Sequence, residues 1–463
     1  MRWMWVWALA ACAGGPTPQD QAAPPPPKAE AKPAAASPDK LAIVIVLDAS
    51  SAPYFGMYGD THSTSPNLDA LAKDGVAFEH AMSASATTGA STGSFLTSTP
   101  VAVHTPEHGA ALSTELTTVG EALTAQGVAT WAVLANPNAG GAARGYERGY
   151  QQVVRAYKGK GFDDAGAAFP LPDDVLGPLT ARIDADGPGP TMIYAHFLQP
   201  HSPYSAPANL ISRFGADPAK SWPDLIAAIT AANTAGKADP ALIAEAEARY
   251  RANIAWIDEA LGRFIAHLKE RGLYDEALIV VTSDHGEAFF HHKKFGHILT
   301  LYEDMTQIPL LIKPPASQHV TPGRISVPVE TIDVPATVVS YFGVPLPASF
   351  QGDDLGPLYR KEVSALPHPE VVASTGNLVI HALRQGDMKL IVRGAASELY
   401  DLAADPDEQT NLAASRPDVV AAMRTALQAK INLQRRTDIK AEAGHAEAPG
   451  EKKMLQTLGY TGE

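Results

Sequence analysis

The chain has almost no cysteine and an excess of acidic over basic residues. Cys12 is the only cysteine among 463 residues, so the body of the protein has no intramolecular disulfide, no cysteine-based metal site and no catalytic thiol. The 50 aspartates and glutamates outnumber the 36 lysines and arginines, which gives a net charge of −14. This balance excludes nonspecific nucleic-acid binding through an overall basic field, and we expect no nucleic-acid partner. An anionic substrate would need positive charge supplied locally, as a metal ion can do.

Long hydrophobic runs are scarce as well. The apolar stretch over residues 3–11 follows Arg2 and is too short to span a bilayer. It ends in Leu9-Ala10-Ala11-Cys12, which resembles the processing box of bacterial lipoproteins, where the cysteine is lipidated. We therefore predict a lipoprotein signal over residues 1–12 and a membrane anchor through lipidated Cys12, at the periplasmic face or outer membrane of a bacterial envelope. An ordinary secretory signal with an incidental cysteine is the alternative.

The rest of the sequence predicts an α/β fold. Residues 13–39 are rich in Pro, Ala and Lys and predict an extended tether without a core. From residue 40, apolar strands alternate with amphipathic helices, which is typical of a mainly parallel central sheet flanked by helices. The clearest helix is predicted over about 242–271, before Gly272. The predicted strands are residues 41–47, 128–134, 191–196, 277–282 and 308–312.

The pattern changes after Pro345. Short strand-like segments at residues 378–383, 388–392 and 398–402 precede a helix at 417–431, which predicts a small antiparallel sheet closed by one helix. We therefore expect three parts after the tether: a catalytic domain, a C-terminal α+β subdomain and a C-terminal tail, over residues 40–345, 346–435 and 436–463.

Acidic residues stand directly after two predicted strands. Asp48 follows strand 41–47, and Asp284-His285-Gly286-Glu287 follows strand 277–282. Open α/β sheets bind ligands at the carboxyl ends of their strands, and in a parallel sheet both aspartates would reach the same edge. Carboxylates and an imidazole suit a divalent metal. This convergence is the hypothesis on which the functional interpretation depends.

Three long segments carry a further signal: residues 46–83, residues 278–315 and residues 398–412 (ELYDLAADPDEQTNL). In that order they resemble the opening, the second metal segment and the C-terminal signature of the sulfatase family, in the alkaline-phosphatase-like superfamily. The resemblance covers most of residues 40–460. It implies an alkaline-phosphatase-like fold and hydrolysis of sulfate esters, or of related anionic esters on glycans, lipids or small molecules, with one divalent metal ion. Calcium is the expected ion, with Mn²⁺ or Zn²⁺ as alternatives, because His285 replaces a frequent Asn and Ala49 a frequent Asp.

The resemblance also implies individual roles. Asp48, Asp284 and His285 fall on the family's metal ligands, with Glu287 expected behind them. Thr88-Gly89-Ala90-Ser91-Thr92 stands at the Cys/Ser-x-Pro-Ser-Arg motif, which puts Thr88 at the nucleophile position and predicts that Ser91 binds substrate.

Histidines form a second predicted cluster. His196 and His201 match a family segment His-x-x-x-Pro-His-x-Pro-Tyr, and His201 is predicted to reach the anionic group of the substrate. His196 is predicted to bind substrate, with a hydrogen-bonded core residue as the alternative. His297 is predicted to be a general acid to the leaving oxygen. Residues 291–294 (HHKK) are interpreted as a solvated basic loop.

The sequence departs from the family at the catalytic motif. Sulfatases convert the Cys or Ser to formylglycine, whereas a threonine could give only a ketone, so no formylglycine is expected. The family's Gly-Lys-x-His segment has no match in residues 131–141. A metal ion and a helix N-terminus would instead lower the pKa of the Thr88 hydroxyl, so that Thr88 can attack directly. A phosphodiesterase or phosphoglycerol-type transferase is therefore one alternative, and a non-catalytic surface binding protein is another.

Overall fold

The computed structural model describes residues 40–104, 111–157, 169–185, 189–297 and 300–434. The predicted signal with Cys12, the tether and the C-terminal tail lie outside these residues. Within the described ranges, no helix is both long enough and apolar enough to cross a membrane.

An eight-stranded sheet crosses the middle of the fold. From one edge to the other its strands are β12 (Gly323–Ile325), β2 (Val76–Phe78), β11 (Leu310–Lys313), β7 (Ala277–Thr282), β1 (Leu41–Leu47), β6 (Thr191–Phe197), β4 (Ala129–Leu134) and β5 (Gln152–Arg155). The central strand β1 pairs in parallel with β6 and β7 and is buried after its first residue. A strand that is apolar on both faces is typical of a covered parallel sheet, and the predicted fold class is confirmed.

The predicted strand 308–312 is wrong as a single element. Pro309 has no backbone N–H to donate to a neighbouring strand, and it separates β10 (Gln307–Ile308) from β11. β11 runs antiparallel between β7 and β2. β10 joins a separate small sheet with β3 (Ala81–Met82) and β13 (Val329–Glu330).

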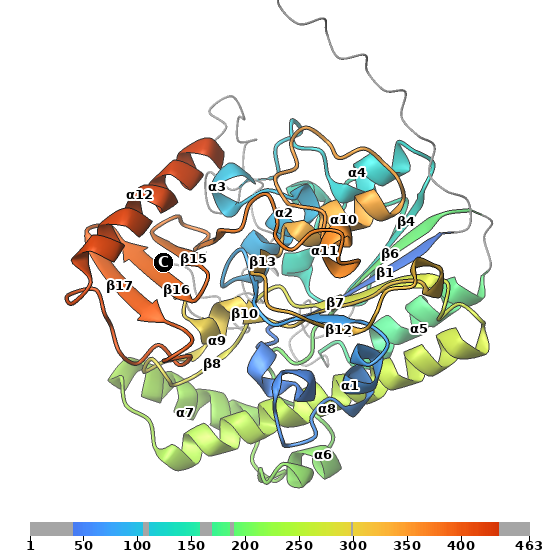
Figure 1. Cartoon of the computed structure of the whole chain (residues 1–463). Helices are drawn as coiled ribbons and strands as arrows, with labels where there is room; N and C mark the ends of the chain where they lie inside the picture. The colour runs from blue at the N-terminus through green and yellow to red at the C-terminus, as the bar shows by residue number, and fades with distance from the viewer. Residues whose placement is uncertain (1–39, 105–110, 158–168, 186–188, 298–299, 435–463) are drawn as a thin grey trace, which may run out of the picture. The chain divides into compact units, whose positions relative to one another are not determined.

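Helices cover both faces of the large sheet (Figure 1). On one face, α8 (Pro240–Glu270) packs against α5 (Pro172–Asp184), which lies on β4 and β6. On the other face, α10 (Asp333–Tyr341) packs against α2 (Thr88–Thr97) and α4 (Val119–Thr124). The remaining α-helices are α1 (Pro66–Ala72), α3 (Val101–His104), α6 (Ala208–Arg213), α7 (Trp222–Ala235), α9 (Glu303–Thr306), α11 (Gly356–Tyr359) and α12 (Pro417–Gln434). Short 3-10 helices are η1 (Ala52–Tyr54), η2 (Gly56–Tyr58), η3 (Pro137–Ala139), η4 (Ala142–Arg144) and η5 (Ala316–Gln318).

A four-stranded antiparallel sheet lies in the C-terminal part of the chain. Its strands are β14 (Val371–Ser374), β15 (Ile380–Gln385), β16 (Met388–Arg393) and β17 (Ala396–Asp401), and a two-stranded ribbon of β8 (Ala288–Phe289) and β9 (Phe295–Gly296) completes the strands. The sequence pattern does not predict β14, because VVAS shows no alternation of apolar and polar residues over a useful length. One face of the sheet packs on α12 through Leu390 and Leu427, and the other on Leu301 and Met305. Both sheets fall in one compact unit, so the boundary at residue 345 stays a prediction.

Tyr250 on α8 fixes the backbone that leaves β1. Its hydroxyl donates to Ala49 O at 2.6 Å and accepts from Ser51 N at 3.0 Å. Without the hydroxyl, both buried backbone groups lose a partner, so we predict that Tyr250→Phe lowers the free energy of unfolding by about 1–3 kcal/mol in urea titrations. Tyr359→Phe is the control, because its hydroxyl meets the side chain of half-buried Gln318, and it should cost less than about 1 kcal/mol. Equal losses in the two variants would contradict this assignment.

Candidate active site

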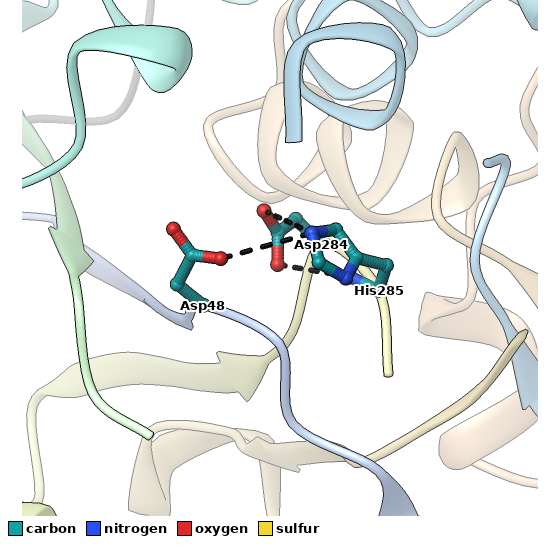
Figure 2. Close-up of side chains that lie close together, drawn as sticks. All are labelled: Asp48, Asp284 and His285. Atoms are coloured by element: carbon teal, nitrogen blue, oxygen red, sulfur yellow. Dashed lines mark hydrogen bonds and ion pairs between the residues drawn. The ribbon is translucent and has the colours of Figure 1, made fainter. Parts of the chain in front are cut away.

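Asp48, Asp284 and His285 meet at the carboxyl ends of β1 and β7 (Figure 2). One ligand atom from each residue lies within 4.8 Å of the others. His285 Nε2 is 3.7 Å from Asp48 Oδ1 and 3.7 Å from Asp284 Oδ2. All three side chains are buried. The convergence expected from two strand ends is therefore present in the fold.

Surrounding hydrogen bonds fix the orientation of these three side chains. Asp284 Oδ1 accepts from Ala49 N at 3.1 Å and from His285 N at 2.9 Å. Asn136 Nδ2 donates to Asp48 Oδ2 at 2.5 Å. His285 Nδ1 lies 2.8 Å from Gly286 O, so Nδ1 carries the proton and the lone pair is on Nε2.

The atoms that remain form a donor set for a cation. Asp48 Oδ1 and Asp284 Oδ2 are buried and make no hydrogen bond within the described part of the chain. These are the two oxygens that face His285 Nε2. Buried polar atoms are rarely left without a partner, and two carboxylate oxygens with one imidazole nitrogen fit a divalent metal ion.

The electrostatics of the cluster also favour a bound cation. Burial raises the pKa of Asp48, and the nearby Asp284 charge raises it further. Burial opposes ionisation of Asp284 too, but His285 and His196 outweigh it and hold the pKa of that carboxyl below its usual range. Burial lowers the pKa of His285, which favours the neutral form that binds metals. Two carboxylates in one dry site repel each other, and a divalent cation removes that repulsion.

Thr88 lies beside the same cluster. It is the first residue of α2, is fully buried, and its Oγ1 is 3.2 Å from His285 Nε2. The hydroxyl is therefore next to the proposed cation and at the positive end of the helix dipole. Ser91, one turn further on, donates its hydroxyl to Ser85 O at 3.1 Å, which ties α2 to the preceding loop. Substrate binding by Ser91 stays a prediction.

His201 and His297 close another side of the cluster. Their ring centroids are 4.6 Å apart, and His297 lies 5.1 Å from the ring of His285. His297 Nδ1 is 3.2 Å from Glu287 Oε1, so Glu287 orients His297; the placement of Glu287 behind the metal ligands stays a prediction. Burial lowers the pKa of His201 to about 3 and that of His297 to about 4. Both rings are therefore neutral near pH 7 before a substrate arrives.

His196 lies in the cluster and not in the apolar core. Its Nε2 is 3.7 Å from Asp284 Oδ2 and 4.0 Å from Asp48 Oδ2, and the ring is fully buried. Neither ring nitrogen makes a hydrogen bond to any residue that the structure describes. Substrate binding by His196 and the alternative of a hydrogen-bonded core histidine both stay predictions.

Residues 291–294 are only partly the solvated loop that was expected. His291 and Lys293 are exposed. His292 instead stacks on Tyr302 with ring centroids 3.5 Å apart, and Lys294 Nζ donates to Asn233 O at 2.7 Å. The apolar faces of these side chains thus pack against neighbouring elements, which the charge pattern alone does not reveal.

Sequence reasoning missed the residues that follow β4. Besides Asn136, which binds Asp48, Asn138 is buried and its Oδ1 accepts from Arg144 Nη1 at 3.3 Å. Tyr146 donates its hydroxyl to Gly89 O at 2.6 Å, next to Thr88. The signal that could have found this segment is the one that found Asp48, namely polar residues directly after a buried strand.

Comparison with known proteins agrees with this geometry. The family model described as Sulfatase matches residues 40–344. The chain belongs to the sulfatase family. Similar curated relatives of this sulfatase-family protein include arylsulfatase K of Bos taurus, 31% identical over 214 residues, and of Xenopus laevis, 33% identical over 206 residues. These matches cover 43% and 41% of the chain but only 39% and 38% of the relatives.

Solved structures show the same fold. A phosphonate monoester hydrolase of Agrobacterium radiobacter has a TM-score of 0.67 at 18% identity, covering 85% of this chain and 96% of its own. A structure described as a 2-O GAG sulfatase has a TM-score of 0.69 at 19% identity, covering 90% of this chain and 100% of its own. At these identities the similarity establishes the sulfatase-family fold, not the substrate.

Metal binding can be tested without a substrate. We predict that Mn²⁺ binds metal-depleted protein at about one ion per chain and raises the Tm by several degrees, because only the folded state presents the converged donors. Asp284→Asn should abolish the shift. Asp258→Asn is the matched control. Asp258 is also a buried carboxylate, but it lies outside the cluster and accepts hydrogen bonds from Asn67 N and Leu68 N. The assignment fails if both variants retain the shift, or if both lose it while remaining folded.

Proposed function

We propose that this protein is a metal-dependent ester hydrolase in which Thr88 is itself the nucleophile. The observation that carries the proposal is the position of Thr88 Oγ1, 3.2 Å from His285 Nε2 and at the N-terminus of α2. One hydroxyl, two carboxylates and several imidazoles share a buried site, an arrangement suited to displacement at a charged ester. The names of the relatives, arylsulfatases and a phosphonate monoester hydrolase, support an anionic ester as substrate.

We further propose that the substrate carries a single negative charge at the reacting group. The largest charge effects on Asp48, Asp284 and Glu287 come from carboxylates and histidines of the cluster, not from lysine or arginine. Asn136 and Asn138 occupy the segment after β4 in which the cationic family motif has no match. A sulfate monoester, a phosphodiester or a phosphonate monoester fits this charge better than a doubly charged phosphate monoester.

Thr88 favours phosphorus over sulfur within this class. A phospho-threonine can be opened by water at phosphorus, whereas a sulfo-threonine is harder to clear without the second hydroxyl of a formylglycine hydrate. A phosphodiesterase or phosphonate monoester hydrolase is therefore the preferred form of the proposal, and sulfate ester hydrolysis is the other candidate.

The cation is proposed to be Mn²⁺ or Zn²⁺. Calcium prefers an all-oxygen ligand set, whereas His285 Nε2 faces the two carboxylates as a third donor. When bound, the cation supplies positive charge that polarises the ester oxygens and lowers the pKa of the Thr88 hydroxyl.

The side chains of the site can carry both halves of the reaction. Thr88 Oγ1 loses its proton to solvent and attacks phosphorus, its bond to phosphorus forms, and the bond from phosphorus to the leaving oxygen breaks. The anionic ester favours protonation of His297, whose Nδ1 faces Glu287, and the other ring nitrogen then gives its proton to the leaving oxygen. In the second half, water oxygen attacks phosphorus and gives a proton to neutral His297, the bond from phosphorus to Thr88 Oγ1 breaks, and Thr88 Oγ1 takes a proton back from solvent.

The location is also a proposal. The Leu9-Ala10-Ala11-Cys12 box supports a lipid anchor at residue 12, which would hold the hydrolase at the bacterial envelope close to glycans and lipids that carry anionic esters.

Substitution of Thr88 tests the nucleophile. We predict that Thr88→Ala lowers kcat by at least about 1,000-fold on a bis-nitrophenyl phosphodiester, while Thr88→Ser retains activity within about tenfold. Thr92→Ala is the control, because Thr92 is buried on the same helix and should leave kcat nearly unchanged. Nitrophenyl sulfate and nitrophenyl phosphate are assayed in parallel. Their relative rates show whether the enzyme prefers sulfur or phosphorus as the reacting atom, and whether it prefers a singly or a doubly charged reacting group. Activity that persists in Thr88→Ala excludes this nucleophile, and wild-type inactivity on every ester would favour the non-catalytic binding protein.

A leaving-group series tests His297. If His297 protonates the leaving oxygen, His297→Gln should lower kcat/KM, which reports only the first half of the reaction, by about 100-fold for an alkyl leaving group and by less than about fivefold for a nitrophenolate, which needs no proton. His292→Gln is the control, because His292 stacks on Tyr302 outside the cluster. Equal losses across the series would show that His297 does not act as the acid.

A further inference from the structure

The short helix α9 joins the three loops that carry Asp48, His285 and Thr88. Asp304 O accepts at 2.8 Å from the hydroxyl of Ser51, which lies three residues after Asp48. Met305 O accepts from Gly286 N at 2.8 Å, next to His285.

The last carbonyl of α9 completes the set. Thr306 O accepts from Ser83 N at 2.8 Å, in the loop that leads to Thr88. Ser51 Oγ also accepts from Glu287 N at 2.9 Å, so two of the loops are joined to each other as well as to α9. A shift of α9 would therefore move the nucleophile and the metal ligands relative to one another.

The side chains of α9 face the C-terminal sheet, which binds them through buried charges. Lys389 Nζ on β16 lies 2.7 Å from Glu303 Oε1 and 3.1 Å from Thr306 Oγ1, at the two ends of α9. Arg384 Nη1 on β15 lies 3.4 Å from Glu303 Oε2. Glu408 accepts from Glu303 N at 2.5 Å and lies 3.0 Å from Lys389 Nζ.

These charges are largely removed from solvent. Lys389 is 0% exposed, and Glu303, Glu408 and Arg384 are buried. Burial opposes the charged form of Lys389, but Glu303 and Glu408 outweigh it and raise the pKa of the ammonium. A buried ion network of this kind is weak evidence for added stability, because desolvation offsets its attraction, but it fixes geometry strongly.

We propose that Lys389, Arg384 and Glu408 are positioning residues, through which the C-terminal sheet holds α9 and thereby sets the relative placement of Asp48, His285 and Thr88. The C-terminal part is then a structural component of the active site, although none of its network residues reaches the metal donors. The inference rests on contacts of the folded chain and does not require that the proposed ester hydrolysis be correct.

Hydrogen exchange of the full-length protein tests the proposal, with Mn²⁺ affinity as a second readout. Lys389→Met is expected to speed amide exchange at Gly286, Glu287 and Ser83 by at least about tenfold, and to weaken Mn²⁺ binding by about tenfold, while β1 and β6 stay protected. Lys389→Arg should restore most of the protection.

The matched control is Lys313→Met. Lys313 is also a buried lysine, but it lies on β11 and donates to Ala277 O at the amino end of β7, away from the site. It should lower the Tm without speeding exchange at the three amides.

The proposal is overturned if these amides exchange at the same rate in wild type and Lys389→Met. It is also overturned if Lys313→Met speeds their exchange as much as Lys389→Met does. If Lys389→Met does not fold, Arg384→Met removes one of the two cations on Glu303 and should speed exchange by about threefold. An unchanged rate in that variant also overturns it. A wild type without activity would count against the proposed function alone, since the exchange readout needs no substrate.

Discussion

The mutual repulsion of two buried carboxylates is the constraint on which this structure depends. Asp48 and Asp284 leave adjacent parallel strands, so the topology of the sheet forces their side chains into one dry volume. Each uses one oxygen for backbone or amide hydrogen bonds and turns the other toward His285 Nε2. Such an arrangement is costly unless a cation joins it, and the rest of the site is organised around the point where that cation fits.

The proposed role of Thr88 depends on its position beside this cation site. In isolation it is a weakly acidic alcohol at the start of a helix, and nothing in its local sequence separates it from its neighbour Thr87. At the N-terminus of α2 and 3.2 Å from His285 Nε2, it has the position of the nucleophile that we propose in place of a formylglycine. Asn136 contacts Asp48 without adding a charge to the site.

Much of the fold and the central triad could be predicted from the sequence, because both rest on local signals. Strand 41–47 is apolar throughout, and polar residues at strand ends converge once the strands are parallel. What could not be predicted rests on contacts between distant segments. Pro309 divides one apparent strand into two sheets, and no periodicity indicates that α9 would bind three loops at once. The ion network around Lys389 likewise joins residues 303 and 408, which no short pattern relates.

The central claim is that Asp48, Asp284 and His285 share one cation beside Thr88. Crystals of the protein grown with Mn²⁺ and measured on both sides of the manganese absorption edge test it directly. The account predicts one strong anomalous peak within about 2.5 Å of a donor atom of all three residues, with Thr88 Oγ1 as a close neighbour. A peak at any other place in the chain, or ordered side chains at the triad with no peak between them, would contradict it.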